Sequence, residues 1–291
     1  MAGRPLEIDL ECCPACTNAN RRLWLRNGMS SYQRCLGCGS IYTSPKVPTE
    51  HQYQKLIEKY ALSAETIQMG VGRKSSLKLI AKTVQQFIPG GIMLDMGCGT
   101  GDFFHYFEPE LWQRFGIEIS PAAAQYSEKL MGVKVFTDLS ETRTFQDGFF
   151  DLVTLLDVVY HLGDPHQILV ELRRLLSPHG MIGLEIAGLS YMLVRSRGIV
   201  CQIVDGKWTR LEPGPPYLNW FSVIGLETLL KRSGFQVIQK KALAGPQTGE
   251  RTTRLFFQYS RAIGSLARVN PYFLTWSPKV LFLATPTPVH D

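Results

Sequence analysis

Three glycines at alternate positions, Gly97, Gly99 and Gly101, constrain the fold of this chain more than any other feature. They follow the apolar residues 92–96, which predict a short strand, and they precede a helix predicted to begin at Asp102. Glycine adopts positive φ and lets a ligand approach the backbone, and a helix start offers unpaired N–H groups. Asp102 would repel a pyrophosphate there, so the pattern favours a turn that binds a ligand without phosphates.

Strands and helices are predicted to alternate around this turn. Further apolar runs indicate strands at 112–119, 133–136, 150–156, 181–187, 235–241 and 279–284. Helical spacing of apolar residues and capping residues indicate helices at 73–87, 120–130, 165–176, 222–232 and 251–266. Strands separated by helices predict an α/β fold with a doubly wound, mostly parallel sheet. An irregular insertion is expected at 188–220 and a second insertion at 245–272.

Two acidic residues end or follow neighbouring predicted strands. Glu118 ends the strand after the glycine turn, where a carboxylate can accept from both hydroxyls of a ribose. Asp138 follows the next strand and could accept from the exocyclic amine of adenine. The pair therefore indicates a nucleoside ligand. The alternative, in which the glycines serve only a tight turn, leaves Glu118 and Asp102 unexplained.

In this order, the motifs resemble those of class I S-adenosylmethionine (SAM)-dependent methyltransferases. Residues 95–101 resemble the first motif of that family, and residues 150–161, 173–180 and 229–235 resemble its later segments. The resemblance covers roughly residues 73–285 and implies a seven-stranded, Rossmann-like sheet with SAM as the cofactor. The cofactor-binding residues that it implies are Asp95, Gly97, Cys98, Gly99, Gly101, Glu118, Ile119, Asp138, Leu139, Leu156 and Asp157.

Five of the seven cysteines lie within the first 38 residues. Cys13 and Cys16 form one C-x-x-C pair and Cys35 and Cys38 a second, a spacing that suits a structural Zn²⁺ held by four thiolates. Cys12 could replace Cys13, although the spacing favours Cys13. Disulfides, free thiols and an iron–sulfur cluster are the alternatives. Because so short a segment cannot build its own core, the metal would stabilise its fold.

The first residues carry acids at Glu7 and Asp9 and lack the apolar stretch of a secretory signal. No apolar run approaches the roughly 20 residues that a spanning helix needs. We therefore expect no membrane span and a location in the reducing cytoplasm, where paired cysteines are more often metal ligands than disulfides.

A zinc ribbon before such a methyltransferase domain resembles a bacterial group whose members methylate sugars, glycan intermediates or other small metabolites. Residues 42–45 match the end of that ribbon. The predicted organisation is a zinc ribbon at 10–45, a linker at 46–72 that could also cover the cofactor, and the methyltransferase domain at 73–291. The expected partner is a small-molecule acceptor, with O-methylation favoured, and the oligomeric state stays open.

The sulfonium of SAM already activates the methyl group, so the protein mainly has to align an acceptor and exclude water. A hydroxyl acceptor would benefit from a general base. His161 follows a strand at the carboxyl edge of the predicted sheet, where ligands of such sheets bind, and it is the first candidate for catalysis. Tyr160 is a weaker one. His161 could equally be a capping or loop residue, and the 188–220 insertion could be a substrate lid.

The main rival is an RNA methyltransferase that uses the ribbon to bind RNA. Its support is a set of basic residues that could contact phosphates: Arg21, Arg22, Arg26, Arg73, Lys74, Lys78 and Lys82. However, the formal net charge of +6 is modest, and lysines at helical spacing are typical of a solvated face. A second rival, a cofactor-binding scaffold without activity, is disfavoured by the intact glycine turn and Glu118.

Overall fold

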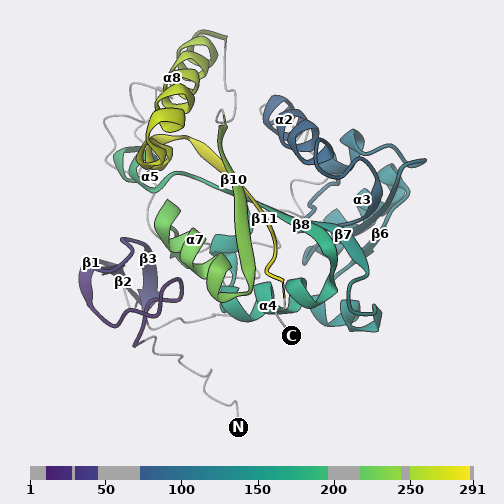
Figure 1. Cartoon of the computed structure of the whole chain (residues 1–291), viewed down its shortest axis with the longest axis horizontal. Helices are drawn as coiled ribbons and strands as arrows, with labels where there is room; N and C mark the ends of the chain where they lie inside the picture. Colours follow the sequence, from purple (N-terminus) through teal and green to yellow (C-terminus); the bar gives the residue numbers. More distant parts are fainter. Residues whose placement is uncertain (1–10, 28–29, 45–72, 196–216, 244–249, 289–291) are drawn as a thin grey trace.

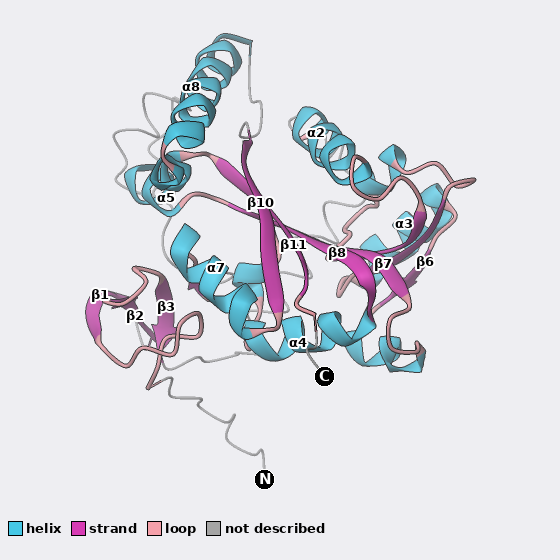
Figure 2. Cartoon of the chain, viewed as in Figure 1, coloured by secondary structure: helices cyan, strands magenta, loops and turns pink. Residues whose placement is uncertain are grey.

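The structure is a computed structural model that describes residues 11–27, 30–44, 73–195, 217–243 and 250–288. The predicted linker at 46–72 and most of the 188–220 insertion lie outside these residues. Two sheets are formed (Figures 1 and 2). The smaller one is antiparallel and contains β1 (Arg21–Asn27), β2 (Ser30–Cys35), β3 (Ile41–Ser44) and β9 (Asn219–Trp220).

The larger sheet has seven strands in the order β10-β11-β8-β7-β4-β5-β6. Only β11 runs against its neighbours, which confirms the predicted mostly parallel, doubly wound sheet. All seven predicted strands are present. Their bounds are β4 (Gly91–Met96), β5 (Trp112–Ile117), β6 (Lys134–Phe136), β7 (Phe150–Leu156), β8 (Leu176–Ile186), β10 (Phe235–Leu243) and β11 (Lys279–Pro286).

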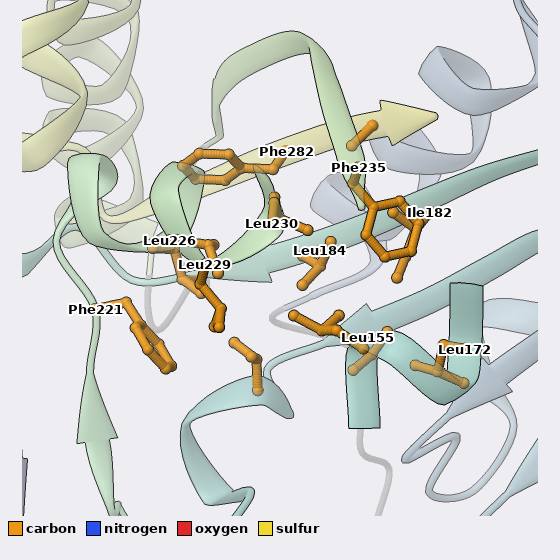
Figure 3. Close-up of a cluster of buried hydrophobic side chains, with 14 of the residues drawn as sticks. Leu155, Leu172, Ile182, Leu184, Phe221, Leu226, Leu229, Leu230, Phe235 and Phe282 are labelled. Carbon is orange, nitrogen blue, oxygen red and sulfur yellow. The ribbon is translucent and has the colours of Figure 1, made fainter. Parts of the chain in front are cut away.

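Helices cover both faces of this sheet. On one face, α2 (Lys74–Gln85) and α3 (Pro121–Met131) pack on apolar side chains of β4, β7 and β11. On the other face lie α4 (Pro165–Leu175) and α7 (Val223–Arg232). In Figure 3, Leu226 and Leu229 of α7 meet Leu184 of β8 and Leu155 of β7. The apolar strands are therefore buried between two helical layers.

Helix starts follow the predicted capping residues. The hydroxyl of Ser120 accepts from the Ala123 N–H, and that of Ser222 accepts from the Gly225 N–H at 2.8 Å. The Asp164 carboxylate accepts from the Gln167 N–H at 3.0 Å. These caps satisfy backbone donors that have no partner within the helix, which explains why each helix starts where it does.

Two segments differ from expectation. After the glycine turn the chain forms a short 3₁₀ helix, η1 (Asp102–Tyr106), because Pro109 restricts the backbone before it and a longer helix cannot continue. The 188–220 insertion is not wholly irregular, since it contains α5 (Leu189–Arg195) and β9. In the second insertion, the predicted helix is present as α8 (Glu250–Val269), followed by the 3₁₀ helix η4 (Pro271–Trp276).

Candidate active site and metal centre

The glycine turn joins the end of β4 to η1 at the carboxyl edge of the sheet. Gly97, Gly99 and Gly101 have φ values of 76°, 55° and 85°, a region that side chains other than glycine rarely adopt. A Cβ atom at Gly97 would overlap the Val158 side chain. The N–H groups of Gly97 and Cys98 both donate to the Ile117 carbonyl, at 2.7 and 3.1 Å. The turn is therefore fixed against the end of β5.

Glu118 connects this turn to the loop after β5. Its Oε2 accepts from the Gly99 N–H and its Oε1 from the Ser120 N–H, each at 2.9 Å. Burial raises the pKa of this carboxyl group, and the backbone hydrogen bonds oppose that rise. An ionised carboxylate accepts about four hydrogen bonds, so Glu118 keeps acceptor capacity for a ligand's hydroxyls. Next to it, the side chain of Ile119 is 38% exposed, which leaves an apolar surface beside the carboxylate.

Three other predicted cofactor residues, Asp95, Cys98 and Leu156, are buried at this edge. Thr154 Oγ1 donates to Asp95 Oδ1 at 2.6 Å, and burial raises the pKa of Asp95 to about 7. The Cys98 side chain packs inward, where a Cβ at Gly116 would lie 2.6 Å from its sulfur. Asp95 and Cys98 are thus held by the fold itself, whatever they contribute to a ligand.

Asp138 lies after β6, at the same edge of the sheet. It is exposed and caps the 3₁₀ helix η2 (Leu139–Thr144), because its Oδ1 accepts from the Ser140 N–H at 2.7 Å. Hydrogen bonding to the Ser140 side chain and to its backbone N–H lowers the pKa of Asp138. Leu139 is half-buried behind it. The carboxylate is therefore ionised and held in a fixed orientation.

A cluster of four charged residues that the sequence did not reveal consists of the predicted cofactor residue Asp157 and three partners. Arg73, at the start of α2, contacts both Asp157 (Nη1–Oδ2 3.2 Å) and the fully buried Glu185 of β8. Lys279 of β11 forms an ion pair with Asp157. Burial opposes ionisation of Asp157, but Lys279 and Arg73 outweigh it and lower its pKa to about 2. The one visible signal was Glu185, an acid within an otherwise apolar strand.

Asp157 also has an unusual backbone, with φ of 66° directly after β7. Positive φ is uncommon for residues other than glycine and is often found at functional sites. The hydroxyl of Tyr160 donates to Asp157 Oδ1. The side chains that bind the Asp157 carboxylate therefore also hold the strained loop after β7 in place.

The two predicted catalytic residues, Tyr160 and His161, lie in the 3₁₀ helix η3 (Val159–His161). Burial and the neighbouring Asp157 carboxylate raise the pKa of Tyr160 well above its usual value, so its hydroxyl remains protonated. The His161 ring stacks on Tyr217, with centroids 5.1 Å apart and planes 28° apart, and meets the Tyr160 ring edge-on at 5.0 Å. Tyr217 comes from the segment before β9, so the C-terminal end of the 188–220 insertion contributes to this aromatic group.

The four predicted metal ligands, Cys13, Cys16, Cys35 and Cys38, converge. Their sulfur atoms all lie within 4.8 Å of one another, with Cys13–Cys38 at 3.7 Å and Cys16–Cys35 at 3.5 Å. Ligands about 2.3 Å from a tetrahedral Zn²⁺ lie about 3.8 Å apart, so the arrangement fits that ion. The same residues are free thiols rather than disulfides. Cys12 is exposed and is not a member of the cluster.

The cysteine-bearing segment is joined to the larger domain through β9 and α7. Ile41 and Tyr42 of β3 pair with Trp220 and Asn219 of β9, which completes the small sheet. Arg232 at the end of α7 donates to the Ala15 carbonyl at 2.9 Å. In Figure 1, α7 lies between the small sheet and the large one. The ribbon is therefore packed into the fold rather than displayed on a free arm.

No helix in the described part of the chain is both long and apolar enough to cross a membrane.

Comparison with known proteins agrees with this geometry. A family model described as a methyltransferase domain matches residues 72–240, more than half of the chain. An uncharacterized protein of Methanocaldococcus jannaschii is 31% identical over 101 residues, which are 35% of this chain and 47% of the relative. The match thus spans about half the length of that relative.

Solved structures share the fold at low sequence identity. A SAM-dependent methyltransferase from Thermotoga maritima aligns with a TM-score of 0.51 and 17% identity over 81% of this chain and 99% of its own. The PH0226 protein of Pyrococcus horikoshii aligns with a TM-score of 0.53 and 16% identity over 75% and 93%.

A third structure is 1,6-didemethyltoxoflavin-N1-methyltransferase of Burkholderia thailandensis, which contains its substrate and S-adenosylhomocysteine. It aligns with a TM-score of 0.52 and 12% identity over 92% of this chain and all of its own. The solved structures share the seven-stranded fold, and the family match places the chain in the methyltransferase-domain family.

Proposed function

We propose that this enzyme transfers the methyl group of SAM to a hydroxyl of a small-molecule acceptor, such as a sugar, a glycan intermediate or a secondary metabolite. The observation that carries this proposal is the position of the ribbon. Cys13, Cys35 and Cys38 contribute to the same buried cluster as the leucines of α7, and β9 completes the ribbon's sheet. The ribbon is thereby tied to the segment that carries Tyr217, beside the aromatic group, which favours a role in positioning an acceptor.

The residues at the carboxyl edge fit SAM. Glu118 would accept from the ribose hydroxyls, and the half-exposed Ile119 would pack on the adenine, with Asp138 near its amine. The glycine turn, Asp95 and Asp157 would surround the methionine part. When bound, the cofactor supplies an activated methyl group on a sulfonium, so the chain mainly has to position the acceptor.

His161 is the residue that we assign as general base. Stacking on Tyr217 and the edge contact with Tyr160 orient its ring at the carboxyl end of β7. Tyr160 does not fit the role of a base, because its raised pKa keeps it protonated at neutral pH. It would instead hold Asp157, to which it donates a hydrogen bond.

The central experiment incubates the full-length protein with methyl-labelled SAM and a fractionated cell extract. We expect label in the small-molecule fraction. Label in RNA would instead support the rival function, for which the exposed Lys74, Lys78 and Lys82 on one face of α2 are the favourable observation. Label in protein would also contradict the proposal.

Binding of SAM can be tested apart from turnover. Glu118→Ala removes a charged acceptor, and we expect SAM affinity measured by calorimetry to fall at least about tenfold. Glu108→Ala is the matched control, because Glu108 is exposed and lies just before the start of β5, at the opposite end of that strand from Glu118. Equal affinities in the two variants would show that Glu118 does not hold the ribose.

The role of His161 has a separate readout. His161→Ala should lower kcat about a hundredfold or more, since general-base catalysis contributes roughly 10²–10⁴-fold, with SAM affinity unchanged. The acidic limb of the pH–rate profile should disappear in this variant. An unchanged kcat, or a profile that keeps this limb, would mean that His161 only stacks.

We further propose that Cys13, Cys16, Cys35 and Cys38 hold one structural Zn²⁺ in a reducing cytoplasm that keeps them as thiolates. Elemental analysis should find about one zinc per chain. Cys16→Ser should lower the zinc content and Cys12→Ser, the matched control, should not. A metal-free protein, or equal loss in the two variants, would contradict this assignment.

A further inference from the structure

An open cavity of about 600 Å³ lies between α8 and the edge strand β10. In Figure 1, α8 and α2 lie to the left and right of the upper end of β10. Gly264 brings the helix close to the strand, because a Cβ there would lie 3.7 Å from that of Ala242. Leu79 of α2 also lines the cavity. The second insertion therefore forms a pocket beside the sheet, and this pocket is separate from the glycine turn.

Every charged residue in the lining of this cavity is a cation. Arg261, Gly264, Ser265 and Arg268 lie three or four residues apart, so they share one face of α8, and Lys241 faces them from β10. No acidic residue is among the residues that line the cavity.

Among the described residues, Lys241, Arg261 and Arg268 form no ion pair, and Lys241 donates only to Thr83 Oγ1, at 3.0 Å. Its neighbour Lys240 is different, because its Nζ pairs with Glu227 at 2.7 Å. Within the described parts of the chain, Lys241 and the exposed Arg261 and Arg268 therefore have no acidic partner at this cavity.

The positive charges of these three residues repel one another. Burial, Arg268 and Lys82 of α2 together lower the pKa of Lys241. Uncompensated like charges destabilise a folded protein and raise the local concentration of anions. Arginines offer the planar fork of donors that suits phosphate oxygens, and lysine adds a point charge. The composition of the cavity fits a phosphate group better than a single carboxylate.

The cavity and the active site lie along one row of the sheet. Lys241 pairs with Leu281, Leu281 pairs with Glu185, and Glu185 pairs with Leu156, the residue before Asp157. Neighbouring strands lie about 4.8 Å apart, so three spacings separate Lys241 from the end of β7 by about 14 Å. Lys241 and Glu185 therefore lie on the same face of one row across the sheet.

We propose that this cavity binds the phosphate or diphosphate group of a small-molecule ligand. A second part of this inference rests on the proposed function. The methyl acceptor itself carries the phosphate or diphosphate group, at the end remote from the atom that is methylated. By the strand spacing, the phosphate group of such an acceptor would lie about 14 Å from the end of β7.

The site is tested first without turnover. Calorimetry of the full chain with inorganic pyrophosphate should show saturable binding. The double variant Arg261→Gln/Arg268→Gln should weaken it at least tenfold and leave SAM affinity unchanged. Lys129→Gln/Lys231→Gln is the control, because it removes the same charge from exposed lysines elsewhere. Absent binding, or equal losses in the two double variants, would overturn the proposal. So would a single-stranded RNA that binds through these arginines while pyrophosphate does not.

The link to the acceptor needs the labelling experiment. Phosphatase treatment of the extract before labelling should abolish labelled small molecules if the acceptor is phosphorylated. Labelled small molecules that survive the treatment would overturn the link to the acceptor and leave the small-molecule function intact. Label found only in RNA or protein would contradict the proposed function itself.

Discussion

The two halves of the large sheet are held together in different ways. On the β4–β5–β6 side, the key contacts are local, since Gly99 and Glu118 lie 19 residues apart and the Gly99 N–H donates to the Glu118 carboxylate. On the β8–β11–β10 side, Arg73 reaches Glu185 over 112 residues and Lys279 reaches Asp157 over 122 residues. The first half is set by backbone geometry and the second by buried charge pairs that form only in the folded chain.

The largest effect is expected from removing a charge pair on the β8–β11–β10 side of the sheet. Arg73→Met would leave Glu185, which is fully buried, without its cation, and removing one partner of a buried pair costs about 3–5 kcal/mol. We expect the free energy of unfolding, measured with denaturant, to fall by about that amount. Arg73→Lys keeps the charge but loses the fork that contacts both acids, so it should cost less. Equal stability of Arg73→Met and the unmodified protein would mean that the pair contributes nothing.

Features set by local sequence patterns could be predicted, whereas those set by contacts between distant residues could not. The seven strands were recognisable because each is a short apolar run buried between helices, and β7 is buried along nearly its whole length. The glycine turn and Glu118 were recognisable because both follow strands directly. β9 was not, since this two-residue strand exists only through its pairing with β3. Its position depends on how the ribbon packs, which no local pattern encodes.

The charge cluster was missed for the same physical reason. Arg73 looks like one more basic residue of an amphipathic helix, and Lys279 like the polar start of a strand. Their roles arise from where α2 and β11 pack, and only Glu185 carried a local signal. The cavity under α8 is similar, because Arg261 and Arg268 resemble a solvated face until Lys241 is placed opposite them.

A second prediction concerns Asp95 of β4 and the pH dependence of the free energy of unfolding. Burial raises the pKa of Asp95 to about 7 from an unfolded value near 3.8, so the folded state binds more protons between these values. Stability should therefore fall as pH rises from about 4 to 7, by up to about 4 kcal/mol at 1.36 kcal/mol per unit. Asp95→Asn, which can still accept from Thr154, should remove this slope.

The measurement is unfolding by denaturant at several pH values. Asp138→Asn is the control, because Asp138 is exposed and its pKa is lowered, so the slope between pH 4 and 7 should persist. A slope that is unchanged in Asp95→Asn would assign it to another group.

The smallest expected effect tests whether the backbone geometry of the glycine turn stabilises the β4–β5–β6 side of the sheet. Gly97→Ala must adopt φ of 76° and place a Cβ against Val158, so we expect a loss of about 2–3 kcal/mol in unfolding free energy and weaker SAM binding. Gly132→Ala is the matched control. Gly132 has φ of 62° with nothing within 4 Å of a Cβ, so it should lose only about 1 kcal/mol and keep SAM affinity.

Adding Val158→Ala to Gly97→Ala separates the two causes. The double variant should recover the part of the loss that comes from the overlap and retain the part that comes from positive φ, which should match the loss in Gly132→Ala. If Gly97→Ala and Gly132→Ala lose the same stability and both bind SAM normally, the turn tolerates a side chain. The cofactor half would then depend on Glu118 and its hydrogen bonds rather than on the glycines.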